Sequence, residues 1–128
     1  KRKFDIRCYI LVSCINNTMK GYWYQEGYIR TATREFSLKN VTNKLIHLTN
    51  DAVQKKADDY GKFEAGNKLS YNDFQKYLDA NYNGTVNFYN DMYPQIKKLA
   101  TDCIKGVYGK MDPYRRENCF EVFYLMKK

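Results

Sequence analysis

The sequence predicts an α+β domain in which helices pack on an antiparallel sheet. Apolar and charged side chains alternate over residues 3–8, which is the period of a half-buried strand. Apolar side chains recur every three to four positions over residues 86–107, which is the period of a helix. The Asn-rich segment 16–21 separates two strand-like runs and favours a hairpin. At 128 residues, the chain can form one domain at most.

The first strand, predicted to end near Ile15, has two chemically different faces. One face is apolar and consists of Phe4, Ile6, Cys8, Ile10 and Val12. The other carries Lys3, Asp5 and Arg7, so a carboxylate stands between two cations and can hold both in place. Lys3 and Arg7 would lie about 13 Å apart, a span that suits an extended anion such as a nucleotide triphosphate. The alternative is a solvated outer face of the sheet.

The hairpin is predicted to bring a second strand, Tyr22–Glu26, back along the first. That return places Arg30 near Arg7. Residues 31–43 are polar and are predicted to form a loop. The run 45–51 passes from apolar residues into Thr and Asn, which is typical of a strand end or a turn that holds a ligand or caps a helix. His47 is expected to be a structural hydrogen-bonding residue, and a short helix follows over residues 51–57.

The second half of the chain is predicted to be mainly helical. Residues 58–68 contain two glycines and mixed charge, which favours a mobile loop. Ser70 and Asp73 resemble a capping box that begins a helix. Pro94 either kinks the longest helix or marks its first turn. The core stripe of that helix is predicted to comprise Phe88, Met92, Ile96, Leu99, Cys103 and Val107, and a final interior strand is predicted over Asn118–Met126.

The composition favours some classes of binding partner but does not select one. The net charge of +8 favours acidic partners, but the basic residues are spread along the chain. The four cysteines lack metal-ligand spacing and indicate reduced, mostly buried thiols of an intracellular protein. The longest apolar run is too short to cross a membrane, and no signal peptide is recognisable. A nucleic-acid binder is disfavoured because no stacking motif accompanies the basic residues.

Four segments resemble the tubulin tyrosine ligase-like family in their order and spacing. They are K-F-D-I-R at 3–7, E-G-Y-I-R at 26–30, H-L-T-N at 47–50 and C-F-E-V-F at 119–123. The resemblance covers essentially the whole chain. It implies an ATP-grasp fold, of which residues 1–128 would be a C-terminal subdomain fragment, and an ATP- and magnesium-dependent ligase. Such an enzyme adds an amino acid to acidic tubulin tails through an acyl phosphate, in the cytoplasm, at microtubules and in cilia or basal bodies.

The resemblance also assigns roles to individual residues. Lys3, Asp5, Thr49 and Asn50 would contact the nucleotide, and Arg7 the terminal phosphate or the acyl phosphate. Arg30 would bind the carboxylate of the incoming amino acid or the transferring phosphate. His47 would orient the H-L-T-N turn at the substrate, and Lys68 would help to hold the amino acid. Asp51 stands where members of the family vary, so it could influence the choice of substrate.

The sequence departs from the family pattern at its end. In the family, C-F-E-V-F continues into acidic residues that hold magnesium, whereas here Tyr124–Lys128 contains none. We therefore expect no metal ligands in this chain and no catalysis by this polypeptide alone. Glutamate is the favoured amino acid, with glycine and tyrosine as alternatives within the family. A microtubule-binding relative without catalysis is the other hypothesis.

Overall fold

Five strands of the described residues form one antiparallel sheet around β1 (Arg2–Ile15). The computed structural model describes residues 1–114, 116 and 119–127. Strands β2 (Thr18–Trp23) and β3 (Tyr28–Glu35) pair with successive parts of β1, and β5 (Cys119–Lys127) also pairs with it. The short β4 (Lys68–Ser70) extends the sheet beyond β3. The predicted antiparallel sheet is therefore confirmed. Asn118, the first residue of the last predicted strand, lies outside the described residues.

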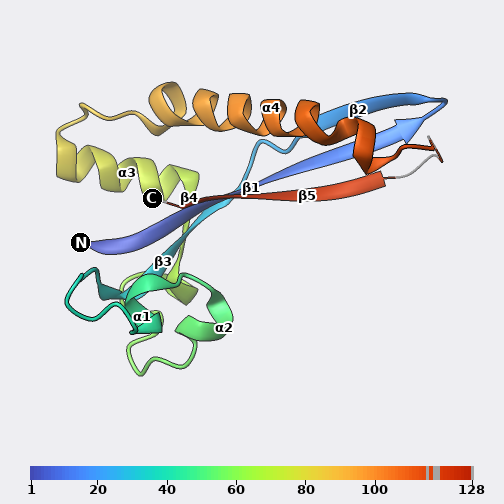
Figure 1. The fold of residues 1–128 in the computed structure, drawn as a ribbon. Helices are drawn as coiled ribbons and strands as arrows, with labels where there is room; N and C mark the ends of the chain where they lie inside the picture. The colour runs from blue at the N-terminus through green and yellow to red at the C-terminus, as the bar shows by residue number, and fades with distance from the viewer. Residues whose placement is uncertain (115, 117–118, 128) are drawn as a thin grey trace.

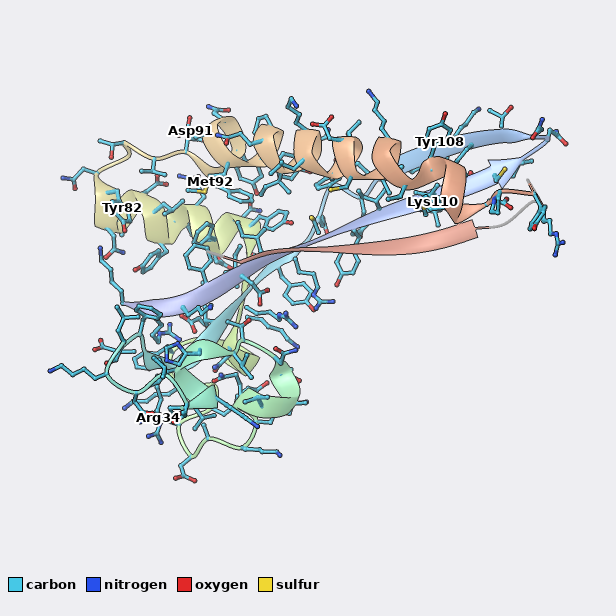
Figure 2. The ribbon with its side chains drawn as sticks, in the orientation of Figure 1. Arg34, Tyr82, Asp91, Met92, Tyr108 and Lys110 are labelled. Atoms are coloured by element: carbon cyan, nitrogen blue, oxygen red, sulfur yellow. The ribbon has the colours of Figure 1, made fainter. Side chains whose placement is uncertain are left out.

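Two long helices cover one face of this sheet. They are α3 (Tyr71–Tyr82) and α4 (Tyr93–Met111), joined through a π-helical turn, η2 (Phe88–Met92). Figure 1 shows both helices on the same side of β1, and Figure 2 shows Tyr82 at the end of α3 and Lys110 near the far end of α4. The predicted apolar face of β1 packs against them, and Cys8 and Val12 are completely buried.

The other face of the sheet meets a small lobe of short elements. It contains α1 (Lys44–His47), α2 (Asp51–Gln54) and the single 3₁₀ turn η1 (Ala65–Asn67). In Figure 1 this lobe lies on the opposite side of the strands from α4, and Figure 2 shows Arg34, near the end of β3, beside it. The lobe brings the H-L-T-N segment against the charged face of β1, since the Thr49 hydroxyl donates a hydrogen bond to Asp5.

Several predicted boundaries are wrong. The first turn contains two residues, Asn16 and Asn17, both with positive φ, so β2 begins at Thr18 rather than at Tyr22. Asn tolerates the left-handed region, which allows this tight turn. Residues 31–35 belong to β3 rather than to a loop, and α1 replaces the predicted strand end at 45–47. The helix that begins at Asp51 ends at Gln54, earlier than predicted.

The inner face of α4 differs from the predicted stripe in its second half. Phe88 and Ile96 are buried as predicted, but Leu99, Cys103 and Val107 are exposed. Their places against the sheet are taken by Ala100, Ile104 and Met111, which pack with Ile10 and Val12. Pro94 is the second residue of α4, so it marks the first turn and does not kink the helix. Ser70 caps α3 as predicted, since its Oγ accepts the Asp73 N–H at 3.0 Å.

Candidate anion-binding site

The centre of the candidate site is a buried ion pair between β1 and β3. Asp5 and Arg30 are cross-strand partners, so their side chains lie on the same face of the sheet. The Arg30 Nε donates to the Asp5 Oδ1 at 3.0 Å and the Arg30 Nη2 donates to the Asp5 Oδ2 at 2.9 Å. Asp5 is 0% exposed and Arg30 is 7% exposed. The two-point contact fixes the plane of the guanidinium group and directs its Nη1 away from Asp5.

Thr49 completes this cluster from the opposite lobe. Its hydroxyl donates to the Asp5 Oδ2, which also accepts from Arg30, and Thr49 is itself 5% exposed. The structure thus brings together three predicted site residues from β1, β3 and the H-L-T-N segment. Asp5 has no solvent-accessible surface, so in this structure it holds Arg30 and Thr49 rather than forming part of the exposed surface. A buried charge paired in this way orients its partner.

Arg7 lies on the same side of β1 as Asp5, two positions along the strand. Its cross-strand partner is Tyr28, and its carbonyl oxygen accepts from the Tyr71 hydroxyl at 2.8 Å. Burial raises the pKa of the Tyr71 hydroxyl, so this donor stays protonated at neutral pH. Gly27 makes this contact possible, because a Cβ at Gly27 would overlap both the Arg7 carbonyl and the Tyr71 hydroxyl. The backbone at Arg7 is therefore fixed from α3.

Lys68 is placed beside Arg30 on the next strand. β4 pairs Lys68 with Arg30 and Ser70 with Tyr28. Cross-strand partners share a face, so Lys68, Arg30 and Asp5 form a row across three strands. The exposed Lys68 has its Nζ 5.8 Å from the centre of the Tyr28 ring. The three side chains carry a net charge of +1, and the Arg30 guanidinium and the Lys68 ammonium both offer N–H donors, which suits a carboxylate or a phosphate.

Lys3 and Asn50 lie at the margins of this row. Lys3 is half-buried and stands where the pairing register of β1 with β3 shifts, between Arg2 and Phe4. Asn50 is exposed and occupies the N-cap position of α2, where its carbonyl accepts from the backbone of Val53 and Gln54. Among the described residues, no hydrogen bond or ion pair joins the side chain of Lys3 or Asn50 to Asp5, and their contacts to a nucleotide remain predictions.

His47 contacts Asn40 and Phe36. Its Nε2 lies 2.9 Å from the Asn40 carbonyl oxygen, and its ring packs edge-on against Phe36. Gln54, which is completely buried, also holds the H-L-T-N turn. Gln54 accepts from the Thr33 N–H at 2.7 Å and donates to the Leu48 carbonyl. Its position at the end of a four-residue helix gave no sequence signal for this role.

The Asp51 carboxylate interacts electrostatically with Lys68. A hydrogen bond from Lys55, one from the Tyr60 hydroxyl and the nearby charge of Lys68 together lower the pKa of Asp51. The Asp51 carboxylate accepts from Tyr60 at 2.5 Å and pairs with Lys55 at 2.8 Å. Asp51 is therefore ionised at neutral pH, and its negative charge is paired with the positive charge of Lys55.

The described residues contain no group of three or more His, Cys, Asp or Glu side chains that could hold a metal ion. Likewise, none of the helices in the part that the structure describes is long and apolar enough to span a bilayer. Cys8 and Cys14 are free and buried, as predicted, whereas Cys103 is exposed. Within the described chain, the candidate site therefore consists of cations, one buried carboxylate, hydroxyl groups and backbone amides.

These features define a class of protein: an α+β domain with a row of charged side chains, two of them cationic, across three strands of its sheet. The family model described as "Tubulin-tyrosine ligase family" matches residues 1–125. The chain belongs to the tubulin-tyrosine ligase family.

Known members of the family show which proteins this chain is similar to. It is 35% identical to "Protein monoglycylase TTLL8" of Homo sapiens over 94% of this chain and 14% of that protein. It is 32% identical to "Tubulin glycylase 3D" of Tetrahymena thermophila over 96% of this chain and 12% of that protein. It is 35% identical to "Probable tubulin polyglutamylase TTLL9" of Mus musculus over 63% of this chain and 17% of that protein. The chain therefore spans less than a fifth of the length of these relatives.

Proposed function

We propose that this chain forms part of an ATP-dependent ligase that joins an amino acid to the acidic tails of tubulin. The family and the names of the relatives support a tubulin amino-acid ligase. The observation that carries the proposal is the two-point ion pair between Asp5 and Arg30, because it presents a guanidinium group in one fixed orientation. A preorganised cation of this kind stabilises negative charge that develops during phosphoryl and acyl transfer.

ATP would supply the phosphoryl group that activates a tubulin carboxylate as an acyl phosphate. The residues of this chain fit the anionic part of such a ligand, since Lys3, Arg7 and Arg30 offer ammonium and guanidinium donors on one strand face. Thr49 and Asn50 would contact the nucleotide from the neighbouring lobe. The described residues contain no group of three or more acidic, His or Cys side chains for magnesium, so its ligands are proposed to come from elsewhere in the full-length protein.

The other end of the row would hold the incoming amino acid. Arg30 and Lys68 are adjacent cross-strand partners, and together they can bind the α-carboxylate and leave the amino group directed at the activated carbonyl. Arg7 would contact the phosphate of the activated carboxylate from the same face. His47 would act at the edge of the substrate site by fixing the preceding loop through Asn40.

Two amino acids compete for this site. Glutamate is the amino acid that the motifs favour, and one relative is named a polyglutamylase. Glycine is favoured by the two relatives named glycylases, whose similarity extends over nearly all of this chain. We therefore treat both as candidates.

The proposed partner is the tubulin tail, whose acidic character complements the +8 charge of this chain. Acting on this partner would place the protein at the cytoskeleton, in the cytoplasm and in cilia or basal bodies. Nucleic acid and membrane are not proposed as partners. A relative that binds microtubules without catalysis would use the same surface.

The experiment is an incorporation assay with the full-length protein. Purified tubulin, Mg-ATP and either labelled glycine or labelled glutamate are incubated with it, and modified tails are identified by mass spectrometry. ATP-dependent incorporation of one of them would support the ligase. Tubulin binding without incorporation of either amino acid would favour the non-catalytic alternative.

A further inference from the structure

The loop of residues 60–67, which we call the buttress loop, is fixed by buried polar contacts although the sequence predicted a mobile loop. Its last residue, Asn67, is 4% exposed and has a φ of 52°. The Asn67 Nδ2 donates to the Thr33 hydroxyl at 2.8 Å and to the Thr31 carbonyl at 3.2 Å. Its Oδ1 accepts from the Gly61 N–H at 2.8 Å, which closes the loop on itself. Asn67 thus joins the buttress loop to β3.

A second contact joins the buttress loop to the start of β1. Glu64 is paired with both ends of the Arg2 guanidinium group, including a 2.9 Å bond from the Arg2 Nη1 to the Glu64 Oε2. The same Glu64 oxygen accepts from the Thr31 hydroxyl at 2.9 Å. The Phe63 ring lies 4.4 Å from the Arg2 guanidinium carbon. Charge-assisted, two-point hydrogen bonds have a defined geometry, so they hold the middle of the loop, at Glu64, in one position.

The third contact reaches α2, which directly follows the H-L-T-N segment. The Tyr60 hydroxyl donates to Asp51 at 2.5 Å and lies 3.2 Å from the Gly66 carbonyl oxygen. The buttress loop, whose last three residues form η1 of the lobe, therefore contacts β1, β3 and α2. Immediately after Asn67 the chain enters β4, whose first residue is Lys68.

We propose that Asn67, Glu64 and Arg2 are positioning residues that set Lys68 opposite Arg30, and so set the geometry of the amino-acid end of the site. This inference rests on the proposed ligase function. β4 has only three residues, so its own ladder cannot fix its register strongly. The buttress loop supplies that register from outside the sheet. The ligand that depends on it is an α-amino acid, recognised through its carboxylate.

The first test is Asn67→Asp in the full-length protein. Asp tolerates the positive φ and keeps the acceptor for Gly61, but it cannot donate to the Thr31 carbonyl. We expect the KM for the amino acid to rise about tenfold. The KM for ATP should change by less than about twofold, because Lys3, Arg7 and Thr49 do not depend on this contact. The matched control is Asn90→Asp, the same change at an exposed position of η2, which should leave both values unchanged.

The second test separates positioning from general stability. If Asn67 acts through Lys68, its effect on the KM for the amino acid should vanish once Lys68 is removed. Lys68→Ala alone should therefore raise this KM, and Lys68→Ala with Asn67→Asp should raise it no further. Two independent increases that multiply in the double variant would overturn the proposal. Equal changes in the KM for the amino acid and in the KM for ATP in Asn67→Asp would also overturn the proposal.

Glu64→Gln covers the case in which Asn67→Asp does not fold. It keeps the size and the acceptor for Thr31 but removes the charge opposite Arg2, so a smaller rise in the same KM is expected. An unchanged KM in this folded variant would overturn the role of the buttress loop while the wild-type protein remains an active ligase. A wild-type protein that incorporates no amino acid would instead remove the proposed function and this inference with it.

Discussion

At the scale of single residues, the buried Asp5 is the group on which the site geometry depends. Its carboxylate accepts from Arg30 and Thr49, and no part of it meets solvent. The sequence showed that Asp5 stands between two cations, and the resemblance assigned it to the nucleotide. Neither the sequence pattern nor the resemblance could show that Arg30 donates to both carboxylate oxygens of Asp5. That contact depends on the pairing register of β1 and β3, which the local sequence does not fix.

Replacing Asp5 by Asn tests whether Asp5 compensates the buried charge of Arg30. Asn67 and Thr31 would be untouched, but Arg30 would keep a buried charge without its partner, which costs about 3 kcal/mol. We expect the full-length protein to melt at a clearly lower temperature in Asp5→Asn. The control is Asp102→Asn on α4, where an exposed pair with Lys98 contributes little. Equal melting temperatures for Asp5→Asn and Asp102→Asn would contradict the buried pair.

Cys8 gives a prediction about pH. Burial raises the pKa of its thiol from 9.0 to about 11. Above pH 9 the unfolded thiol loses its proton and the folded thiol keeps it, so this group lowers the stability of the fold as the pH rises toward 11. We expect a smaller fall in melting temperature between pH 9 and pH 11 in Cys8→Ala than in the wild-type protein. The exposed Cys103→Ala serves as the control, and a difference there of the same size would contradict the assignment.

At the scale of secondary-structure elements, Gly27 decides how closely α3 approaches β1. The Tyr71 hydroxyl reaches the Arg7 carbonyl only because Gly27 has no side chain. We expect Gly27→Ala to destabilise the fold by about 2 kcal/mol, since the added methyl group has no room. Gly21→Ala provides the comparison, because a Cβ at Gly21 would meet no atom within 4 Å. If thermal unfolding of the two variants is the same, the close approach of α3 is wrong.

The sequence predicted the elements whose signal is local. The capping residue Ser70, the alternation of β1 and the first half of the α4 stripe needed only neighbouring residues. Residues 31–35 were mistaken for a loop because the groups that stabilise them, Gln54 and Asn67, come much later in the chain. In α4, both Leu99 and Ala100 satisfy a helical period, and only the position of the sheet determines which of the two is buried.

At the scale of the whole molecule, the candidate site is a surface assembled from three parts of the chain. β1 supplies Arg7, β3 supplies Arg30 and β4 supplies Lys68, while the lobe fixes Asp5 through Thr49. Sequence spacing predicted that Arg30 returns to β1 but not that it aligns with Asp5. The relatives are several times longer than this chain, so the proposed activity is tested with the full-length protein.

The most direct measurement compares Arg30→Ala with the wild-type full-length protein in amino-acid incorporation and in ATP binding. Arg30 is proposed to bind the substrate carboxylate or the transferring phosphate, whereas Lys3, Thr49 and Asn50 are proposed to hold the nucleotide. We expect incorporation into tubulin to be abolished and the Kd for ATP, measured by titration calorimetry, to change by less than about threefold. Incorporation at a rate near that of the wild type would contradict the role of the Asp5–Arg30 pair.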